Sequence, residues 1–250
     1  MPAGERLTLF FPMWNEEEII GRTVDAARET GDDLSERGDI AGYEILIVDD
    51  ASTDGTAKLA DELAAADDRI RVVHHAENRG LGGSVRTGLA EARGDLILYT
   101  DADMPADLAD LAKALRLLRI YDADIVTAYR HDRTGEGAKR AVYSYIYNTL
   151  VKALLRLRIR DVNFAFKLVR RRVLDDVKLH SEGSFVDVEL LAKAQRMGFA
   201  IIQFGVDYFP RARGASSLSS PSVIIRIVRE FAALYPDILR TKPPPRRRRG

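Results

Sequence analysis

The fold is decided by the stretch Asp95-Leu-Ile-Leu-Tyr-Thr-Asp101-Ala-Asp103. A short apolar run bounded by polar residues is typical of a strand buried in a parallel sheet. If the chain is extended up to Asp101, the side chains of Asp101 and Asp103 point the same way, because strand side chains alternate with a period of two. Two close carboxylates repel each other unless a cation lies between them, and a divalent cation shared with a phosphate-bearing substrate is the usual solution. We therefore predict a metal site here, against the alternative of a turn with two solvated carboxylates.

The sequence around this stretch alternates between apolar strands and amphipathic helices. The predicted strands are residues 7–11, 43–48, 70–74, 95–100 and 124–128. The predicted helices begin after Asn15 and span residues 57–66, 85–93 and 107–121. We expect Asn15 to cap the first helix and Asp54 the second, because such side chains accept hydrogen bonds from unpaired backbone N–H groups. Alternation at this spacing predicts right-handed βαβ units around a parallel sheet.

Polar clusters follow four of the predicted strands. They are Pro12 to Glu16, Asp49 to Asp54, Asn78 to Gly83 and Asp101 to Pro105. In open α/β sheets, ligands bind beyond the carboxyl ends of the strands. Acidic residues scattered over a surface would not align with strand ends in this way. The sequence therefore predicts that the clusters share one ligand site at one edge of the sheet.

The second half of the chain, from residue 129, is less regular. A polar loop over residues 129–140 carries Arg130, Arg133, Lys139 and Arg140. After it we predict a helix over 142–157, a strand over 161–169, a helix over 186–197, a strand over 200–206, a basic loop over 211–217 and a helix from a Ser222 cap to about Tyr235. We therefore expect one domain over residues 1–239, with halves at about 7–128 and 129–239, and a disordered Pro/Arg tail over 240–250.

Composition narrows the class of protein. Of 250 residues, 46% are hydrophobic and 30% charged, which is ordinary for a soluble globular domain with one sizeable core. Because the chain has no cysteine, disulfides, thiolate metal sites and cysteine nucleophiles are excluded, which suits a reducing compartment. The first residues lack the apolar stretch of a signal peptide. No window approaches the ~18 apolar residues that a membrane-spanning helix needs.

Basic residues gather at the end of the chain. The formal net charge is zero, yet six basic residues and no acidic one fall among the last eleven, which leaves 32 basic against 38 acidic residues elsewhere. The preceding helix has an apolar face made of Val223, Ile224, Ile227, Val228, Phe231 and Leu234. Such a helix either anchors the protein at an anionic membrane surface together with the tail, or packs on its own domain. We favour packing for the helix and lipid contact for the tail, because four Arg without aromatic residues indicate nucleic acid only weakly.

The motifs resemble, in order and spacing, those of the nucleotide-sugar half of the inverting glycosyltransferases of family 2. The matching stretches are Pro12-Met-Trp-Asn15-Glu16, Val48-Asp49-Asp50-Ala-Ser52-Thr-Asp54-Gly-Thr56, Asn78-Arg-Gly80-Leu-Gly82 and Asp101-Ala-Asp103. A later stretch, Arg211-x-x-Gly214-x-Ser216, looks like a loop of the polyprenyl-phosphate sugar transferases, the dolichyl-phosphate mannose synthase branch. The resemblance covers roughly residues 7–218. It implies a GT-A fold, with a Rossmann-like, mostly parallel central sheet flanked by helices and an irregular acceptor-side second half.

The resemblance implies a role for each motif. Pro12, Trp14 and Glu16 would border the base and ribose of the donor, and Asp49 and Asp50 would contact the base. Asn78 and Gly82 would lie near the ribose and phosphates. Asp101, Ala102 and Asp103 would lie at the diphosphate, with the two Asp carboxylates holding Mg²⁺ or Mn²⁺.

The sequence departs from this branch at two positions. Pro105 stands where the branch usually has Gln, and it offers no side-chain ligand for the metal. Ser217 stands where the branch usually has Lys, so one phosphate-binding cation is missing and Arg213 is the candidate replacement.

The mechanism depends on the acceptor. A divalent cation offsets the charge that builds on the leaving diphosphate, and attack from the opposite face of the sugar inverts the anomeric centre. A phosphate monoester, with a second pKa of about 6, is already largely a dianion at neutral pH and needs cations rather than a base. Arginine binds phosphate through a rigid fork of donors. The candidate clamps are Arg130, Arg140, Arg211 and Arg213.

Two enzymatic interpretations remain open. The first is transfer of a sugar, mannose from GDP-mannose being favoured, to a polyprenyl phosphate at the cytoplasmic face of the membrane, with or without a separate membrane partner. The alternative uses a UDP-sugar and a hydroxyl acceptor, with Asp187 or Glu189 as base. As structural residues, these two acids would cap a helix, and the four histidines show no metal-binding spacing. A non-catalytic nucleotide-binding or membrane-adaptor protein would bind nucleotide without turnover. A dinucleotide oxidoreductase is disfavoured because Gly80-Leu-Gly82-Gly83 follows the third strand and lacks the required spacing.

Overall fold

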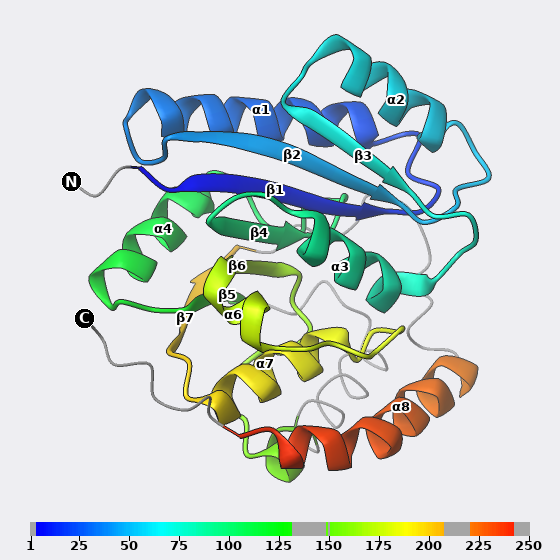
Figure 1. The fold of residues 1–250 in the computed structure, drawn as a ribbon, viewed down its shortest axis with the longest axis vertical. Helices are drawn as coiled ribbons and strands as arrows, with labels where there is room; N and C mark the ends of the chain where they lie inside the picture. Colours follow the sequence, from blue (N-terminus) through cyan, green and yellow to red (C-terminus); the bar gives the residue numbers. More distant parts are fainter. Residues whose placement is uncertain (1–3, 132–148, 150, 208–220, 243–250) are drawn as a thin grey trace.

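The protein is a layered α/β structure built on a single seven-stranded sheet (Figure 1). The computed structural model describes residues 4–131, 149, 151–207 and 221–242, and only the backbone of residues 221–228. The strands are β1 Arg6–Met13, β2 Gly42–Asp49, β3 Ile70–His74, β4 Leu96–Thr100, β5 Ile125–Arg130, β6 Phe166–Arg170 and β7 Ile201–Val206. Their order across the sheet is β3-β2-β1-β4-β6-β5-β7. Only β6 runs antiparallel to its neighbours, so the predicted, mostly parallel sheet is confirmed.

Helices cover both faces of this sheet. They are α1 Ile20–Glu36, α2 Thr56–Ala66, α3 Gly80–Glu91, α4 Asp110–Ile120, α6 Arg171–Asp176, α7 Val186–Met197 and α8 Pro221–Arg240. Leu7, Leu9 and Phe11 of β1 pack with α1 and α4, whereas Phe10 packs with α3 on the other face. This division follows from the period of two of a strand, and both faces of β1 are apolar because both are covered. Beyond α7, the second half of α8 closes a further apolar cluster, in which Ile238 is fully buried.

The predicted cap of the first helix is wrong. Helix α1 begins at Ile20, five residues after Asn15, and its N-cap residue, Ile19, makes no side-chain capping bond. Asn15 instead has a left-handed backbone, with φ of 56°, and its side-chain oxygen accepts a hydrogen bond from Thr53 N–H. Asparagine tolerates this conformation better than most residues do. The polar side chain therefore ties two loops together instead of capping a helix.

Other predicted boundaries also shift. Gly55 occupies the N-cap position of α2, but the carboxylate of Asp54 still accepts a hydrogen bond from Thr56 N–H, so Asp54 serves the start of this helix. The strand predicted over residues 161–169 is confined to Phe166–Arg170. Ser222 lies inside α8, which begins at Pro221 and continues to Arg240, beyond the predicted end near Tyr235.

Parts of the predicted second half lie outside the described residues. Of the helix predicted over 142–157, residues 151–155 are helical. Most of the predicted tail, residues 243–250, and the basic loop over 211–217 are not described. In the part of the chain that is described, no helix has both the length and the apolar character required to span a membrane.

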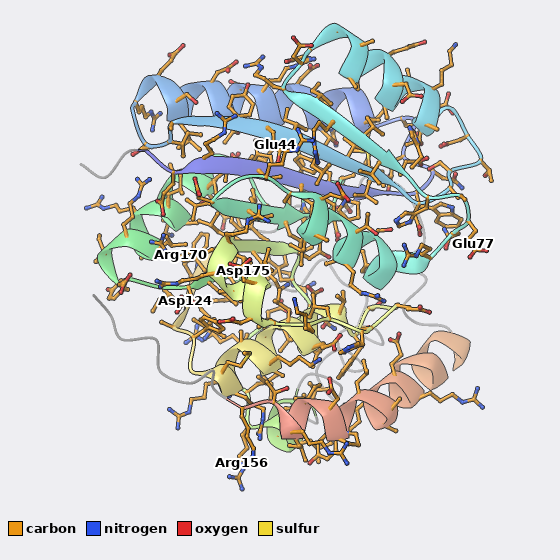
Figure 2. All side chains as sticks on the ribbon, viewed as in Figure 1. Glu44, Glu77, Asp124, Arg156, Arg170 and Asp175 are labelled. Carbon is orange, nitrogen blue, oxygen red and sulfur yellow. The ribbon has the colours of Figure 1, made fainter. Side chains whose placement is uncertain are left out.

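Ion pairs hold the edge of the sheet where the parallel strands begin. Arg170 pairs with Glu5, and its backbone N–H donates to the carbonyl of Asp124. Arg172 also binds the Asp124 carboxylate, which accepts a further hydrogen bond from Ala200 N–H at 2.7 Å. Figure 2 shows Arg170 and Asp124 on the left, far from Glu77 on the right, which follows β3. The charges at the edge where the parallel strands begin thus stabilise the fold, and the predicted site lies at the edge where these strands end.

Candidate active site

The polar clusters lie at one edge of the sheet, where β1 to β4 end; the arrowheads of these strands point to the right in Figure 1. Pro12 pairs in register with Val48, and Asp49 with His74. Because β6 is antiparallel, it begins at this edge, and β5 ends there with Arg130. Parallel strands therefore bring the four sequence-predicted clusters and Arg130 to a common edge.

The loops after β1 and β2 are joined into one unit. Asn15 N–H donates to Ser52 Oγ at 3.0 Å, and Thr53 N–H donates to Asn15 Oδ1 at 2.8 Å. Glu16 N–H donates to Thr56 Oγ1 at 2.8 Å. These bonds hold the predicted Pro12 to Glu16 cluster against the Asp49 to Asp54 cluster. Within the first cluster, Trp14 is 56% exposed, which leaves an aromatic side chain open to a ligand.

Two buried carboxylates at the end of β2 are each paired with a histidine at the end of β3: His74 is its last residue and His75 follows it. His74 Nδ1 lies 2.9 Å from Asp49 Oδ2, and His75 Nδ1 lies 2.6 Å from Asp50 Oδ1. Asp49 and Asp50 are only 2% and 3% exposed. The hydrogen bond with Asp49 raises the pKa of His74, although partial burial opposes it. Both carboxylates are thus held in place before any ligand arrives.

We did not predict these pairs from the sequence. The signal was present, because polar doublets end two strands that turn out to be parallel neighbours, and the register sets Asp49 beside His74. The far nitrogen of His75 lies 2.9 Å from Thr87 Oγ1 of α3, so this imidazole is fixed on both sides. Without the register, nothing in the sequence tells which of the acidic residues a histidine will meet.

The loop after β3 wraps around Asp50. Asn78 Nδ2 donates to the backbone carbonyl of Asp50 at 3.1 Å, and Arg79 N–H donates to its carboxylate at 2.8 Å. Gly82 is buried, and its N–H donates to the carbonyl of Glu182 at 3.0 Å. The residues predicted to bind the nucleotide-sugar, Asp50, Asn78 and Gly82, are therefore brought together, but the backbone N–H of Gly82 is already hydrogen-bonded within the chain. Its approach to a donor phosphate stays a prediction.

Residues 101–104 form a turn directly after β4. Met104 N–H donates to the carbonyl of Asp101 at 3.0 Å, so the alternation of the strand stops at Thr100 and does not by itself set the directions of Asp101 and Asp103. Ala102 is buried, and its carbonyl accepts a hydrogen bond from Thr23 Oγ1 of α1 at 2.6 Å. This anchors the turn.

The two carboxylates of this turn suit a hard divalent cation. Asp101 and Asp103 are half-buried and flank the buried Ala102 at the edge of the sheet where β1 to β4 end, called the ligand edge below. Mg²⁺ and similar ions take oxygen ligands and commonly use one or two carboxylates, with water and phosphate completing the shell. Pro105 is buried and supplies no side-chain ligand, as expected. The donor set therefore fits a metal that is shared with a diphosphate.

A buried ion pair joins β6, the neighbour of β4 in the sheet, to α7. The side chain of Lys167, 0% exposed, donates to the carbonyl of Phe164 at 2.7 Å, and its Nζ lies 2.8 Å from Asp187 Oδ1. The ammonium also lies over the ring of Tyr99, 5.6 Å from its centroid. Burial raises the pKa of Asp187, and Lys167 opposes this rise. Asp187 is thus a carboxylate balanced by an internal lysine, with a side chain only 4% exposed.

Glu189 has a structural task. Its fully buried carboxylate accepts hydrogen bonds from the backbone N–H groups of His180 and Ser181 and from Lys193 Nζ, at 2.7–3.0 Å. Neither Glu189 nor Asp187 caps α7, whose N-cap residue, Phe185, has no side-chain capping bond. The predicted capping role is therefore wrong for both acids. Both lie in the interior because α7 is buried on every side, which its position in the sequence does not reveal.

Arg130 is the candidate acceptor clamp that the structure describes. Its Nε donates to Asp161 Oδ2 at 2.8 Å, and its guanidinium lies 5.7 Å from the centroid of the Phe164 ring. The side chain is 10% exposed, so Arg130 is held at the ligand edge with little freedom. Arg140, Arg211 and Arg213 lie outside the described residues.

The model of the family described as "Glycosyl transferase family 2" matches residues 8–178, a range that includes every motif at the ends of β1 to β4. The chain belongs to glycosyltransferase family 2. The family predicted from the motifs is thereby confirmed.

Three curated relatives of this family 2 chain resemble it to a similar degree. The glycosyltransferase AglD of Haloferax volcanii is 32% identical over 244 residues, which are 96% of this chain but 37% of AglD. The polyprenol monophosphomannose synthase of Mycolicibacterium smegmatis is 31% identical over 236 residues, covering 88% of this chain and 83% of that protein. The dolichyl-phosphate beta-glucosyltransferase of Homo sapiens is 31% identical over 218 residues, covering 82% and 67%. The chain thus spans little more than a third of AglD and a larger share of the other two.

Solved structures share the fold of this family 2 chain. The mannosyltransferase PcManGT from Pyrobaculum calidifontis, in complex with GDP-Man and Mn²⁺, has a TM-score of 0.64 at 22% identity, covering 98% of this chain and 67% of that one. Glucosyl-3-phosphoglycerate synthase from Mycobacterium tuberculosis, in complex with Mn²⁺, UDP and glucosyl-3-phosphoglycerate, has a TM-score of 0.68 at 20% identity, covering 97% and 82%. The predicted GT-A fold is confirmed.

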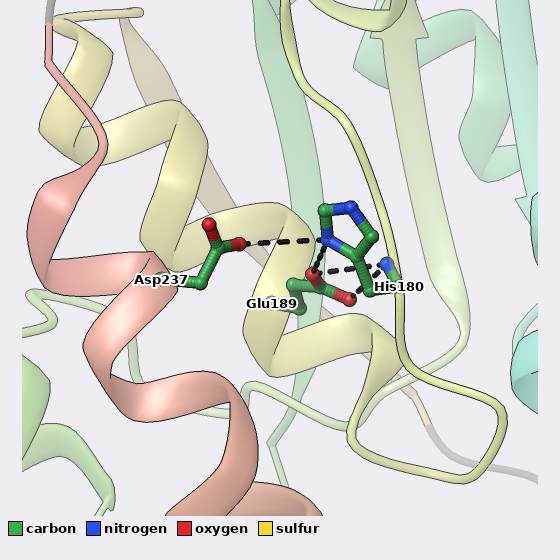
Figure 3. Close-up of side chains that lie close together, drawn as sticks. All are labelled: His180, Glu189 and Asp237. Atoms are coloured by element: carbon green, nitrogen blue, oxygen red, sulfur yellow. Dashed lines mark hydrogen bonds and ion pairs between the residues drawn. The ribbon is translucent and has the colours of Figure 1, made fainter.

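A group of ligand-type side chains outside the four predicted clusters does not form a metal centre. His180, Glu189 and Asp237 offer ligand atoms within 4.8 Å of one another, and Figure 3 shows them facing each other from a loop, α7 and α8. Lys193 Nζ, however, lies 2.7 Å from Glu189 Oε1 and 2.6 Å from Asp237 Oδ2. The hydrogen bond from Lys193 also lowers the pKa of Asp237. An ammonium group thus supplies the positive charge that a metal would bring.

A cavity of about 220 Å³ lies at the opposite edge of the sheet and is also distinct from the donor motifs. Its lining includes Arg6, Tyr43, Glu44, Arg69, Arg71 and Arg93. Arg69 is bound to Asp32 and Asp67, and Arg71 to Glu44. Because its cations are largely matched by carboxylates, this cavity does not compete with the Asp101 edge as the site of a family 2 enzyme.

Proposed function

We propose that this chain transfers a sugar from a nucleotide-sugar donor to a polyprenyl phosphate, with inversion at the anomeric carbon. The observation that carries the proposal is the convergence of the four predicted clusters at the carboxyl edge of β1 to β4. Ligands of open α/β sheets bind at this edge. The family supplies the reaction class, and two relatives are named for transfer involving polyprenol or dolichyl phosphate.

The donor would lie along the ends of β1 to β4. We assign Pro12, Trp14 and Glu16 to the base and ribose, and Asp49 and Asp50 to the base. We assign Asn78 and Gly82 to the ribose and phosphates, and Asp101, Ala102 and Asp103 to the diphosphate. The supporting geometry is the exposed Trp14 ring beside two carboxylates held by histidines. A Mg²⁺ or Mn²⁺ ion held by Asp101 and Asp103 would offset charge on the leaving diphosphate. Two structures of this fold are described with Mn²⁺.

The acceptor phosphate would bind beside Arg130, at the end of β5. As a dianion it attacks without a general base, so the protein must hold it close to an anionic donor by positive charge. We assign this role to Arg130, Arg140, Arg211 and Arg213. Arg130 is already fixed by Asp161, which keeps its guanidinium at the ligand edge. GDP-mannose is our favoured donor and mannose the transferred sugar, because the M. smegmatis relative is named a polyprenol monophosphomannose synthase.

The lipid acceptor requires access to a membrane surface. We propose peripheral binding at the cytoplasmic face through the basic end of the chain, with or without a separate membrane partner. Within the domain proposed over residues 1–239, the described second half of α8 packs inward through Phe231, Leu234 and Ile238. Lipid contact is therefore assigned to the basic tail. Deleting residues 241–250 should weaken sedimentation with anionic vesicles; unchanged binding would remove the tail from the proposal.

The alternative with a hydroxyl acceptor and a UDP-sugar needs a base that can reach solvent. Glu189 is occupied by backbone amides, and Asp187 is buried against Lys167. The raised pKa of Asp187 is the one observation in its favour. The substitution Asp187→Asn separates the two: transfer to polyprenyl phosphate should survive it in any variant that remains folded, whereas a base mechanism requires the carboxylate.

Thermal shift with GDP- and UDP-sugars, with and without Mn²⁺, tests the donor site, and transfer to a short polyprenyl phosphate in detergent tests the reaction. Asp101→Asn should abolish the Mn²⁺-dependent shift and the transfer. The matched control is Asp68→Asn, an exposed acid at the cavity on the opposite edge, which should change neither. A donor that stabilises Asp101→Asn as well as the parent protein would refute the assignment of the metal.

A further inference from the structure

A short loop over residues 180–183 lies between α8 and the start of α3 and touches both (Figure 1). On the side of α8, Glu230 Oε1 accepts hydrogen bonds from Gly183 N–H at 2.8 Å, Glu182 N–H at 3.2 Å and Ser181 Oγ at 3.4 Å. On the side of α3, the carbonyl of Glu182 accepts the N–H of Gly82 at 3.0 Å. One peptide segment therefore joins the C-terminal helix to the loop assigned to the donor.

The backbone of this loop packs directly against the backbone at the start of α3, with no room for a side chain between them. A Cβ atom on Gly82 would lie 2.5 Å from the carbonyl carbon of Glu182 and 2.5 Å from the carbonyl oxygen of Ser181. Gly80 has φ of 71°, and a Cβ there would lie 2.9 Å from the carbonyl oxygen of Glu182. Real Cβ atoms do not approach backbone this closely. Glycine thus allows the two backbones to touch, and a displacement of one must move the other.

The other end of the connection reaches Asp50. Arg79 N–H, three residues before Gly82, donates to the Asp50 carboxylate, and Asn78 Nδ2 donates to the Asp50 carbonyl. Two carboxylates accept hydrogen bonds from the backbone N–H groups of the 180–183 loop. Glu189 of α7 holds the N–H groups of His180 and Ser181, and Glu230 of α8 holds those of Glu182 and Gly183. The half of the loop that touches Gly82 depends on α8.

We propose that Glu230 is a positioning residue for the donor loop, residues 78–82. Through residues 181–183, Glu230 fixes the position of Gly82 and thereby the hydrogen bonds of Asn78 and Arg79 to Asp50. This rests on the proposed function, which puts the nucleotide-sugar at that loop. The chain of contacts is continuous: side chains of Glu230, Asn78 and Asp50 bond the backbone at its two ends, and backbone meets backbone at Gly82, which is the kind of physical connection that can carry coupling between sites.

The carboxylate of Glu230 suggests a conservative control. All three hydrogen bonds go to Oε1, whereas Oε2 is buried and has no hydrogen-bond partner among the described residues. A glutamine keeps one such acceptor oxygen, so Glu230→Gln should preserve the loop, and Glu230→Ala should release it. Asp237→Asn is the matched control on the same helix, because it weakens the ion pairs with Lys193 and with His180 at the start of the loop but leaves the hydrogen bonds of Glu230 to residues 181–183 in place.

The test combines amide hydrogen exchange with nucleotide binding on the full chain. In Glu230→Ala we expect faster exchange at Glu182, Gly183 and Gly82, and about tenfold weaker binding of GDP or UDP with Mn²⁺, since the charged acceptor shared by the Glu182 and Gly183 amides is lost. The KM for the donor should rise, with kcat at saturating donor nearly unchanged. Glu230→Gln and Asp237→Asn should resemble the parent protein in every readout.

Several results would overturn the proposal. Faster exchange at Gly183 without a change at Gly82 would break the connection, and equal effects of Asp237→Asn and Glu230→Ala would reduce it to general docking of α8. If Glu230→Ala fails to fold, Gly183→Ala serves instead, because its Cβ would lie 2.6 Å from Glu230 Oε2 and displace the carboxylate. If the parent protein binds no nucleotide, the proposed function fails, while exchange at Gly82 still decides the role of Glu230.

Discussion

Replacing Lys167 by Met removes the ammonium that faces the buried carboxylate of Asp187. Lys167 Nζ lies 2.8 Å from Asp187 Oδ1 and donates to the carbonyl of Phe164 at 2.7 Å, and the two charged side chains are 0% and 4% exposed. Methionine has a similar length and no charge. The substitution therefore keeps most of the packing but leaves a carboxylate in the interior without its cation.

The size of the effect follows from this burial. Removing one partner of a buried ion pair costs about 3–5 kcal/mol, because the remaining charge is desolvated and unmatched. For a chain of this length, each kcal/mol lowers Tm by roughly 2–4 °C, so Tm should fall by about 6–20 °C. Lys58→Met is the matched control: its ion pair with Glu62 is long, at 3.7 Å, and the lysine is 81% exposed. We expect the control to change stability by less than about 0.5 kcal/mol.

The dependence on pH identifies the cause. Burial already raises the pKa of Asp187, and the loss of the opposing Lys167 charge should raise it further. A carboxyl group with a raised pKa in the folded state holds its proton there while the unfolded chain releases it. Stability therefore falls as pH rises above the unfolded pKa of about 4. The penalty of Lys167→Met should be smallest near pH 5 and grow toward pH 8.

Urea denaturation of the parent protein and of Lys167→Met, Asp187→Asn and the double variant measures the coupling between the two side chains. We expect the double variant to be more stable than Lys167→Met alone, because the unmatched charge is gone. A penalty that does not change between pH 5 and pH 8, or a double variant that simply adds the two losses, would refute the reasoning that the carboxylate is the cause.

Three further predictions concern the ligand edge. The hydrogen bond with Asp49 raises the pKa of His74, so the stability that this pair contributes is complete below the unfolded pKa of about 6.5 and is lost as pH rises through the folded pKa. In urea denaturation, His74→Gln should therefore lower the free energy of unfolding more at pH 6 than at pH 9. The reverse order would contradict this. Gly82→Ala should cost about 1–3 kcal/mol in thermal unfolding because its Cβ meets backbone at 2.5 Å. Gly21→Ala, with nothing within 4 Å on α1, should gain about 0.5–1 kcal/mol, and equal effects at both glycines would be inconsistent with the contact. Removing divalent cations with a chelator should abolish the thermal shift caused by nucleotide-sugar, and excess Mn²⁺ should restore it; a shift that persists in chelator would exclude the metal from donor binding.

The sequence by itself determined the elements of the first half and the edge at which the site lies. Apolar runs of strand length, each followed by a polar cluster and an amphipathic helix, are local patterns, and local patterns are readable from contiguous residues. The positions of Asp49, Asn78 and Asp101 at or just after the ends of strands followed from these patterns. Their motifs also identified the family. The predicted cap at Asn15 failed because a side chain with local options can also bond across to a neighbouring loop.

Only the tertiary structure decided the partners of the buried charges. The antiparallel β6 lies between β4 and β5, which sets Lys167 beside Tyr99 and opposite Asp187. The histidines at the end of β3 meet Asp49 and Asp50 because of the strand register, and Gly82 meets Glu182 across a hundred residues of chain. Such pairs join residues that are far apart in the sequence, and no periodicity or spacing encodes which will meet. Their cause is the close packing of the assembled layers, in which each buried charge or amide must find a partner nearby.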